Sequence, residues 1–213
     1  DSTIGSALML SGFASECLLR FGSNELKEAY LPKVAEGKML SGAAFAEPNT
    51  DFNSNPLSTT ALKDGDNWII NGQKSFVLNA GAAGFYCVLC GTNNDKGANL
   101  ILVEAKSEGV DVADSGEKLG LRMTTTAGLI FHDVRVPIGN LIGKEENGLK
   151  QAQKFIDENC ILIASLALGT AQGSFDRALD YVKQREQFGK KIVLFQVTQH
   201  KLADMATKIE QAR

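Results

Sequence analysis

The stretch Trp68–Asn79, WIINGQKSFVLN, constrains the fold of this chain more than any other. Two runs rich in β-forming residues flank the dipeptide Asn71–Gly72. Asn-Gly between such runs is the strongest short-range hairpin signal, because both central residues of a type I′ turn need a positive φ. The stretch therefore predicts two strands, Trp68–Gly72 and Gln73–Leu78, joined by a tight turn.

The predicted hairpin lies inside a longer region of β character, which runs from Leu40 to Val136. Short segments rich in β-forming residues alternate there with loops of Gly, Asn and Asp. Many short strands at this spacing are typical of a barrel or a sandwich, whereas a Rossmann domain would alternate strands with helices. The further strands that we expect are Ser41–Ala46, Leu57–Lys63, Phe85–Gly91, Ala98–Glu104, Val110–Val112 and Leu129–Val134.

Two helices are expected before the β region. Ile4–Phe21 has the spacing of a single helix, and Asn24–Ala35 has that of a second one. Asn24 is a suitable N-cap residue, since its side chain can accept a hydrogen bond from the first turn. Pro32 has no backbone N–H to donate, so we expect it to kink the second helix or to end it early.

Two more helices are expected after the β region. Leu149–Arg185 is predicted to form one long helix, and its middle, Cys160–Gly169, is apolar on nearly all sides, as in a helix buried inside a bundle. Apolar residues at helical spacing continue through Leu194–Arg213 without a stop signal. Because the chain also does not begin with Met, it is interpreted as a piece of a longer protein.

Composition and charge exclude several function classes. The chain has 213 residues, 44% of them hydrophobic, which is ordinary for a globular protein with one or two cores. The formal net charge is −3 and no Lys/Arg cluster is present, which argues against a nucleic-acid surface. The longest apolar run, Ile161–Leu168, is too short to span a membrane. The sequence contains no GxGxxG, P-loop or HExxH motif.

The four cysteines make a poor disulfide framework in a chain of this size, so we expect the cytoplasm or the mitochondrial matrix rather than secretion. Cys87 and Cys90 have CxxC spacing, but both belong to a predicted buried strand. Residues three apart on a strand face opposite sides. The pair is therefore interpreted as two packed core thiols, and no metal site is predicted.

Several stretches, taken together, resemble one protein family. Ala44–Pro48, AFAEP, precedes Trp68–Ala80, and Lys118–Arg122, KLGLR, follows it. Arg185–Lys190, REQFGK, lies on the last helical segments and is followed by Phe195-Gln196. In their order and spacing along the whole chain, these stretches resemble the acyl-CoA dehydrogenases.

The resemblance implies an α+β multidomain fold. Residues 1–39 would end an N-terminal helical domain, residues 40–138 would form a middle antiparallel β-barrel domain, and residues 139–213 would begin a C-terminal helical bundle that is truncated here. It also implies an acyl-CoA substrate, an FAD cofactor bound between the barrel and the bundle, an electron-transferring flavoprotein as redox partner, and a homodimer or homotetramer. The reaction would remove an α-proton, pass the β-hydride to the flavin and give a 2-enoyl-CoA.

The same resemblance assigns cofactor contacts. Phe76 and Val77 would lie on the strand that runs along the flavin ring. Arg185 would reach the FAD pyrophosphate of a neighbouring subunit, because a planar guanidinium suits that anion. The remaining residues implied in this flavin-contacting segment are Gln187, Phe188, Phe195 and Gln196.

Four places depart from the family pattern, and one of them is Cys160 on the long helix. Ala46 and Leu78 stand where the family has Thr or Ser, so two side-chain hydrogen bonds to the flavin are missing. The loop Asn49–Asn53 has no glycine where the family has a Gly-rich loop. These departures keep open a divergent member that has lost flavin binding or catalysis and serves as a binding or structural module. They also keep open a flavoprotein of changed chemistry, such as an oxidase or a monooxygenase.

The long helix carries the substrate candidates. The resemblance implies that Asp157 lies near the acyl-CoA entry, whereas Cys160 replaces a family Arg. In a minority of the family the catalytic Glu sits on this helix, at the position of Asn159 here. Glu158 is one residue away and about 100° around the helix, so we expect it to point elsewhere and keep it only as an alternative. The catalytic Glu is expected beyond Arg213.

Overall fold

The computed structural model describes residues 2–48, 57–92, 97–114 and 116–213, so the predicted ligand loop Asn49–Asn53 lies outside the described residues. The chain divides into two compact units. One is Ser6–Glu158, and the other combines Asp1–Gly5 with Asn159–Arg213. The predicted division into residues 1–39, 40–138 and 139–213 is not tested by these units and stays a prediction.

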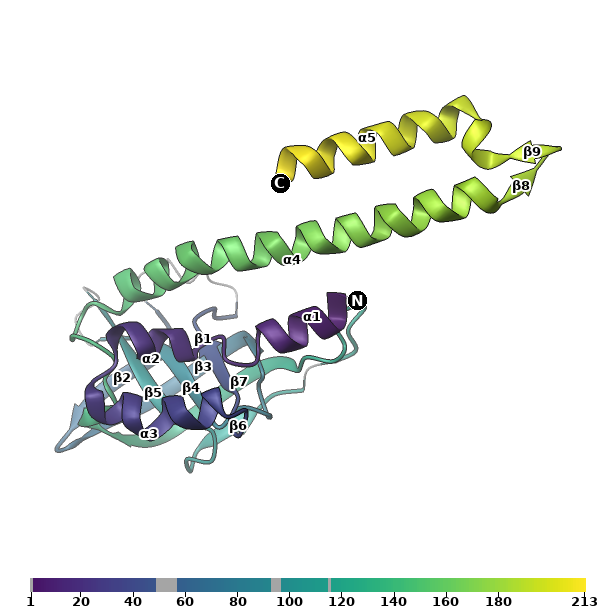
Figure 1. Ribbon diagram of the computed structural model, residues 1–213. Helices are drawn as coiled ribbons and strands as arrows, with labels where there is room; N and C mark the ends of the chain where they lie inside the picture. The colour runs from purple at the N-terminus through teal and green to yellow at the C-terminus, as the bar shows by residue number, and fades with distance from the viewer. Residues whose placement is uncertain (1, 49–56, 93–96, 115) are drawn as a thin grey trace. The chain divides into compact units, whose positions relative to one another are not determined.

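A curled seven-stranded sheet forms the centre of the Ser6–Glu158 unit (Figure 1). Its order is β1-β4-β2-β3-β7-β6, and β5 pairs with β4. Most neighbours are antiparallel, but β1 pairs with β4 in parallel, so the α+β class is confirmed and the sheet is mixed. The strands are β1 (Ser41–Ala44), β2 (Thr60–Asp64), β3 (Asn67–Leu78), β4 (Phe85–Gly91), β5 (Ala98–Glu104), β6 (Val110–Val112) and β7 (Thr126–Pro137).

Strands β4 and β5 separate two hydrophobic cores. Alternate residues of β4, such as Tyr86 and Val88, pack with β3 and β7 inside the curl. The residues between them, such as Cys87, pack with helices α2 (Ser15–Phe21) and α3 (Asn24–Ala35). Because both faces are covered, β4 is buried along its whole length. The expected opposite orientation of Cys87 and Cys90 is confirmed, since the two thiols lie in different cores.

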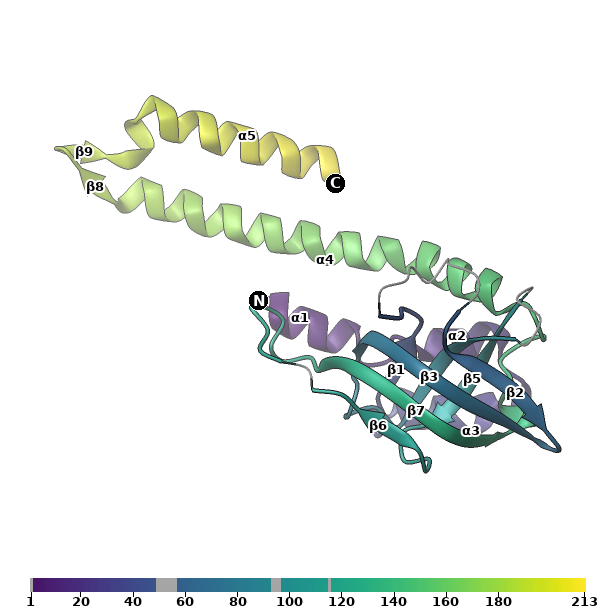
Figure 2. The same cartoon turned by 180° about the vertical axis from the view of Figure 1, so that it is seen from behind.

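The predicted hairpin at Asn71–Gly72 is wrong. Strand β3 runs straight through these residues, and Figure 2 shows it beside β7 along its length. The pairing of β3 with β7 shifts register between Ile70 and Gly72, so the dipeptide marks a local irregularity within one strand. The turn lies earlier, at Gly65–Asp66, where Asp64 pairs with Asn67 and Gly65 has a φ of +58°.

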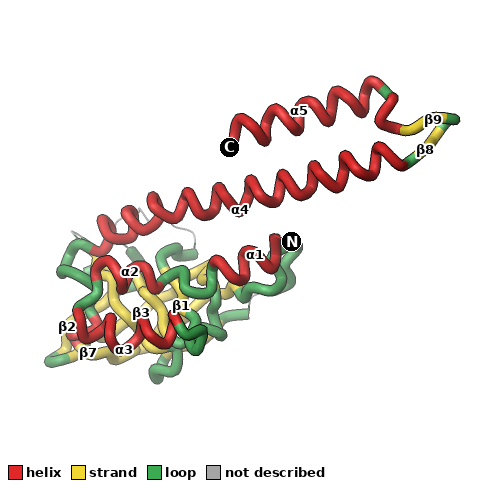
Figure 3. The backbone as a smooth tube through the Cα atoms, viewed as in Figure 1, coloured by secondary structure: helices red, strands yellow, loops and turns green. Residues whose placement is uncertain are grey.

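The helix predicted at Ile4–Phe21 is in fact two, α1 (Ser2–Met9) and α2, separated by a short loop in Figure 3. The break falls at Ser11-Gly12, where helix propensity is low, and the backbone N–H of Ser15 donates to the Ser41 side chain at 3.1 Å. The cap of α3 is Ser23 and not Asn24, because the Ser23 hydroxyl accepts from the N–H of Leu26.

Helix α3 does not end at Pro32, which lies inside its last turn. Proline removes one i→i−4 backbone hydrogen bond there, and the helix ends three residues later at Ala35. The short 3₁₀ turn η1 (Ile138–Asn140) follows β7. Among the described residues, no helix has the length and apolar character to cross a membrane.

The long helix is confirmed to within one residue as α4 (Gly148–Gln184). It is followed by the hairpin β8 (Glu186–Gln187) and β9 (Lys190–Lys191), the 3₁₀ turn η2 (Ile192–Leu194) and helix α5 (Gln196–Ala212). The burial expected for Cys160–Gly169 is not found, since Ile161 is 72% exposed and Leu162 and Ile163 are exposed as well. An apolar run on all sides of a helix needs several packing partners, and the described residues do not supply them.

Candidate functional site

Strand β3 presents an aromatic ring at a bulge. A second register shift against β7, between Lys74 and Val77, leaves Ser75 and Phe76 out of the pairing, and we call these two residues the β3 bulge. Phe76 has a φ of +54°, a conformation that costs a bulky residue on the order of 1–3 kcal/mol, and it is 81% exposed. A strained strand that holds a ring in solvent is suited to present a flat surface to a ligand.

The β3 bulge is fixed to the chain segment that follows β1. The backbone N–H of Ser75 donates to the carbonyl oxygen of Ala46 at 2.9 Å. The two positions expected at the flavin, 46 and 76, are therefore neighbours on one surface. The Ser75 Oγ atom is buried and has no hydrogen-bond partner among the described residues. Buried polar atoms without a partner are rare in native proteins, so this hydroxyl is a candidate for a contact with a ligand.

A buried ion pair supports this surface from below. Lys74 Nζ lies 2.8 Å from Glu47 Oε1, and both side chains are 0% exposed. Lys74 also donates to the carbonyl oxygen of Phe45 at 3.2 Å. The Glu47 carboxylate accepts from the N–H and hydroxyl of Ser58 and from the N–H of Thr59, at 2.6 to 2.9 Å. These bonds join β3, the segment after β1 and the start of β2 at one point.

The charge state of this pair follows from its surroundings. Burial by itself would raise the pKa of Glu47, but the hydrogen bonds from Lys74, Ser58 and Thr59 outweigh it and lower the pKa to about 2. Burial also lowers the pKa of Lys74, and the neighbouring Glu47 opposes that effect. Glu47 is thus held as a carboxylate whose oxygens are occupied, so it is suited to positioning the strands and not to accepting a proton from a substrate.

The two residues after the bulge face different surroundings. The Val77 side chain is buried in the core inside the curl, so a contact from Val77 to a ligand would have to come from its backbone. Leu78 is partly buried and pairs with Thr126 of β7. Its side chain offers no hydrogen-bonding group at the end of the strand.

The second group of predicted residues centres on the β8–β9 hairpin, in the other unit, so the expectation that Arg185–Lys190 lies on helical segments is wrong. Its two loop residues, Phe188 and Gly189, have φ values of +54° and +77°, as a type I′ turn requires. Phe188 is 91% exposed. Its ring meets that of Phe195 edge-on at 6.4 Å, and Lys190 Nζ lies 4.5 Å from the centre of the Phe195 ring. The hairpin is therefore a small aromatic and cationic projection.

Arg185 closes the base of this hairpin, since its carbonyl oxygen accepts from the N–H of Ile192 at 2.9 Å. Its side chain is exposed and forms no ion pair with any described residue. The guanidinium is thus available to an anion. Gln187 pairs with Lys190 across the hairpin, and Gln196 is the first residue of α5; both are exposed.

The two acidic candidates lie on α4 in the Ser6–Glu158 unit. Asp157 is exposed and accepts a hydrogen bond from the Gln153 side chain at 2.6 Å. Glu158 lies 2.7 Å from the Nε atom of Arg20, which also pairs with Glu16. The Glu158 carboxylate is therefore already engaged in an ion pair with Arg20.

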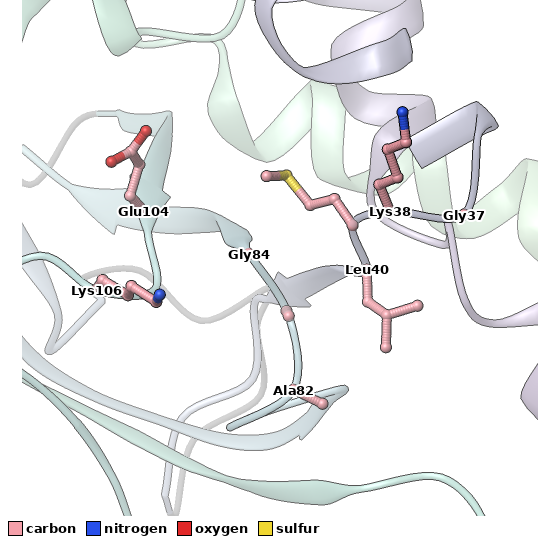
Figure 4. Close-up of a pocket in the computed structure, with 9 residues that line it drawn as sticks. Gly37, Lys38, Leu40, Ala82, Gly84, Glu104 and Lys106 are labelled. Carbon is pink, nitrogen blue, oxygen red and sulfur yellow. The ribbon is translucent and has the colours of Figure 1, made fainter. Parts of the chain in front are cut away.

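A cavity of about 430 Å³ in the same unit contains none of the predicted site residues (Figure 4). Lys38 pairs with Glu36 at 2.6 Å, and Glu104 accepts a hydrogen bond from the Tyr30 hydroxyl at 2.6 Å. Lys38 and Glu104 are thus each paired within the protein. The lining residues are Gly37, Lys38, Met39, Leu40, Ala82, Ala83, Gly84, Glu104 and Lys106.

The sequence interpretation missed Glu47, Lys74 and Ser75. The one signal for Lys74 is its place inside a predicted strand, because a lysine that points inward from a strand needs a buried partner. No comparable signal marks Ser75, since its neighbour Ala46 lies 29 positions earlier in the chain and only the folded sheet brings the two together.

Two family models match the chain in succession. One, described as the middle domain of acyl-CoA dehydrogenase, matches residues 42–134, and one described as its C-terminal domain matches residues 146–213. The short-chain specific acyl-CoA dehydrogenase of Clostridium acetobutylicum is 36% identical over 98% of this chain and 56% of its own length. The chain spans about half the length of the curated relatives it matches.

Solved structures agree with these matches. Butyryl-CoA dehydrogenase from Megasphaera elsdenii has a TM-score of 0.92 and 33% identity, over 99% of this chain and 56% of its own. A glutaryl-CoA dehydrogenase from Mycobacterium smegmatis, solved in complex with FADH2, has a TM-score of 0.89 and 30% identity, over 95% of this chain and 52% of its own. The likeness thus extends over nearly all of the chain.

Proposed function

The chain belongs to the acyl-CoA dehydrogenase family, and we propose that it is the flavin-contacting part of an FAD-dependent oxidoreductase acting on the CH–CH group of acyl-CoA thioesters. The observation that carries this proposal is the succession of two matched family domains along one chain. The exposed ring of Phe76 on a strained bulge adds local support, because nothing in the folding of the strand itself requires it.

Two features of the described residues fit a flavin nucleotide. Phe76 offers an exposed aromatic surface. Arg185 offers a guanidinium free of ion pairs among the described residues, and its planar fork suits a pyrophosphate. The contact around Arg185 would be extended by the other predicted residues of this segment, Gln187, Phe188, Phe195 and Gln196.

When bound, FAD supplies the acceptor for the hydride that leaves the β-carbon of the acyl chain. The protein must then hold the Cα–Cβ bond in place and remove the α-proton with a carboxylate whose pKa is raised in a dry cleft. Glu158 is already paired with Arg20, so we do not assign it this role. We therefore assign the base to a residue outside positions 1–213, and we give Asp157, an exposed carboxylate, a role at the entry of the acyl-CoA.

The partners of the enzyme are proposed on the same basis. An electron-transferring flavoprotein would take the electrons, since a reduced flavin must be reoxidised before the next turnover. Homodimers or homotetramers would bring Arg185 to the FAD of a neighbouring subunit. The cytoplasm or the mitochondrial matrix remains the proposed location.

One observation favours a second candidate. Ala46 and Leu78 provide no hydroxyl to a flavin, and a neutral hydrogen bond contributes about 0.5–1.5 kcal/mol net. Losing two such bonds would weaken FAD binding by roughly one to two orders of magnitude. The second candidate is therefore a divergent member of the family that keeps the fold as a binding or structural module.

The visible absorption spectrum of the full-length protein separates these candidates. We expect flavin to co-purify or to bind on addition, and the anaerobic addition of acyl-CoAs from a chain-length series to bleach its absorption. Absence of flavin binding would contradict the proposed function and support the structural module. A bound flavin that no acyl-CoA bleaches would instead indicate a flavoprotein of different chemistry.

A further inference from the structure

The hydroxyl of Ser75 is the buried polar group of the β3 surface that the assigned contacts leave unexplained. Its oxygen is buried, yet it has no hydrogen-bond partner among the described residues. An unpaired buried hydroxyl weakens a fold, because it gives up its hydrogen bonds to water and gains none in return. Such a group is expected to serve a purpose outside the folding of the chain.

The position of Ser75 is fixed on both sides. The preceding residue, Lys74, is anchored to Glu47 and to the carbonyl oxygen of Phe45. The following residue, Phe76, is held at a positive φ with its ring exposed. The backbone N–H of Ser75 itself donates to Ala46 at 2.9 Å. The strand therefore has little freedom to turn the hydroxyl toward another protein group.

Ser75 lies next to Ala46, and position 46 is where the family resemblance leads us to expect a hydroxyl. Ala46 has none, and a methyl group there leaves a flavin ring without one of its side-chain partners. Ser75 is held next to it, on the strand that carries the exposed ring. A hydroxyl can donate to the carbonyl oxygens and ring nitrogens of a flavin or accept from its N–H group.

We propose that the Ser75 hydroxyl hydrogen-bonds to the bound flavin and replaces the hydroxyl that position 46 lacks. The inference rests on the proposed function, since it needs a flavin to be bound. It gives the buried unpaired oxygen a partner, and it explains how FAD binding is kept although Ala46 and Leu78 contribute no side-chain hydrogen bond. Glu47 and Lys74 act beneath it as positioning residues.

The test compares Ser75→Ala with the unchanged full-length protein. FAD affinity is measured by titration of the apoprotein, together with the flavin absorption spectrum and the melting temperature of the apoprotein. We expect Ser75→Ala to bind FAD about threefold to tenfold more weakly, as for the loss of one hydrogen bond. We expect its apoprotein to melt at the same temperature or higher, because the variant removes an unpaired buried oxygen.

Two further variants sharpen the result. Ser107→Ala, a matched change on the loop between β5 and β6, should leave FAD affinity unchanged. Ala46→Ser combined with Ser75→Ala should restore much of the affinity, because it returns a hydroxyl to the neighbouring position.

The outcomes distinguish the inference from the function it rests on. If the unchanged protein binds no FAD, the proposed function fails and the inference fails with it. If the unchanged protein binds FAD and Ser75→Ala binds it equally well, the inference alone is overturned. A Ser75→Ala apoprotein that melts at a clearly lower temperature would give the hydroxyl a structural role, which also overturns it.

Discussion

At the scale of single residues, the most informative feature is that a strained backbone and an exposed aromatic ring occur at the same two positions. Phe76 and Phe188 are bulky residues with φ values of +54°, and both rings are exposed. A positive φ opposes folding at each site, and an exposed ring returns little stability. The family resemblance of the sequence predicts both positions as cofactor contacts. The strain is thus found where ligand contacts are expected.

The Glu47–Lys74 pair predicts how the stability of the folded protein changes at acid pH. The folded-state pKa of Glu47 is about 2, below the ordinary value of 4.5. Because the folded pKa is depressed, the carboxylate contributes stability that is present above pH 4.5 and is lost as the pH falls toward 2. We expect the free energy of unfolding in urea to fall across this window, and to fall less steeply in Glu47→Gln.

Replacing Lys74 gives a second test of the buried pair, through the free energy of unfolding at neutral pH. Lys74→Met leaves a buried carboxylate without its cation, so it should cost about 3–5 kcal/mol at neutral pH. The double variant Glu47→Gln with Lys74→Met should recover part of that loss, because no charge stays buried. An unfolding free energy in Lys74→Met equal to that of the unchanged protein would contradict the buried pair.

At the scale of elements, sequence patterns identified strands and helices better than the connections between them. Strands β4, β5 and β6 have the predicted bounds, because both β4 and β5 are continuous apolar runs with polar residues at their ends. The hairpin at Asn71–Gly72 was wrong, because Asn-Gly also permits a bulge and only the pairing with two neighbouring strands decides between the two.

The site was predictable to a similar extent. Phe76 and the segment around Arg185 were identified as candidates from the resemblance, because their stretches are contiguous in sequence. The junction of Glu47, Lys74 and Ser58 was not, since three separate segments meet there only after the sheet has formed. Local patterns carry no information about which distant segments will pair, and this limits what any single sequence predicts about a site.

Gly65, in the turn between β2 and β3, and Gly72, within β3, should differ in how much stability is lost when each is replaced by alanine. A Cβ at Gly72 would lie 2.5 Å from the Thr59 Cα atom, where the backbone would have to move. A Cβ at Gly65 would meet nothing within 4 Å. Both have positive φ, so each Ala variant bears a backbone cost of roughly 1–2 kcal/mol.

Only Gly72→Ala adds a steric clash to this backbone cost, so we expect it to lose about 3 kcal/mol or more of unfolding free energy, and Gly65→Ala to lose about 1–2 kcal/mol. Urea denaturation of the two variants, side by side, measures the difference. Equal losses would mean that the close approach of Thr59 is not rigid, and a larger loss for Gly65→Ala would contradict the predicted clash at Gly72.

At the scale of the whole molecule, the exposed middle of α4 governs how the 213-residue chain behaves in solution. Ile161, Leu162 and Ile163 are consecutive, so their exposed side chains are spread over about 200° of the helix circumference. A contiguous apolar surface of this kind marks a site of association. A single exposed leucine such as Leu119, on a loop of the other unit, does not form such a surface.

We therefore expect the chain of residues 1–213 to associate with itself in a concentration-dependent way, because association removes the apolar surface of α4 from water. Light scattering coupled to gel filtration measures the mass over a dilution series. The double variant Ile161→Glu with Ile163→Glu should shift the chain toward the monomer, whereas Leu119→Glu should leave the mass unchanged. Association that persists in the double variant and disappears in Leu119→Glu would show that the contact surface lies on the loop and not on α4.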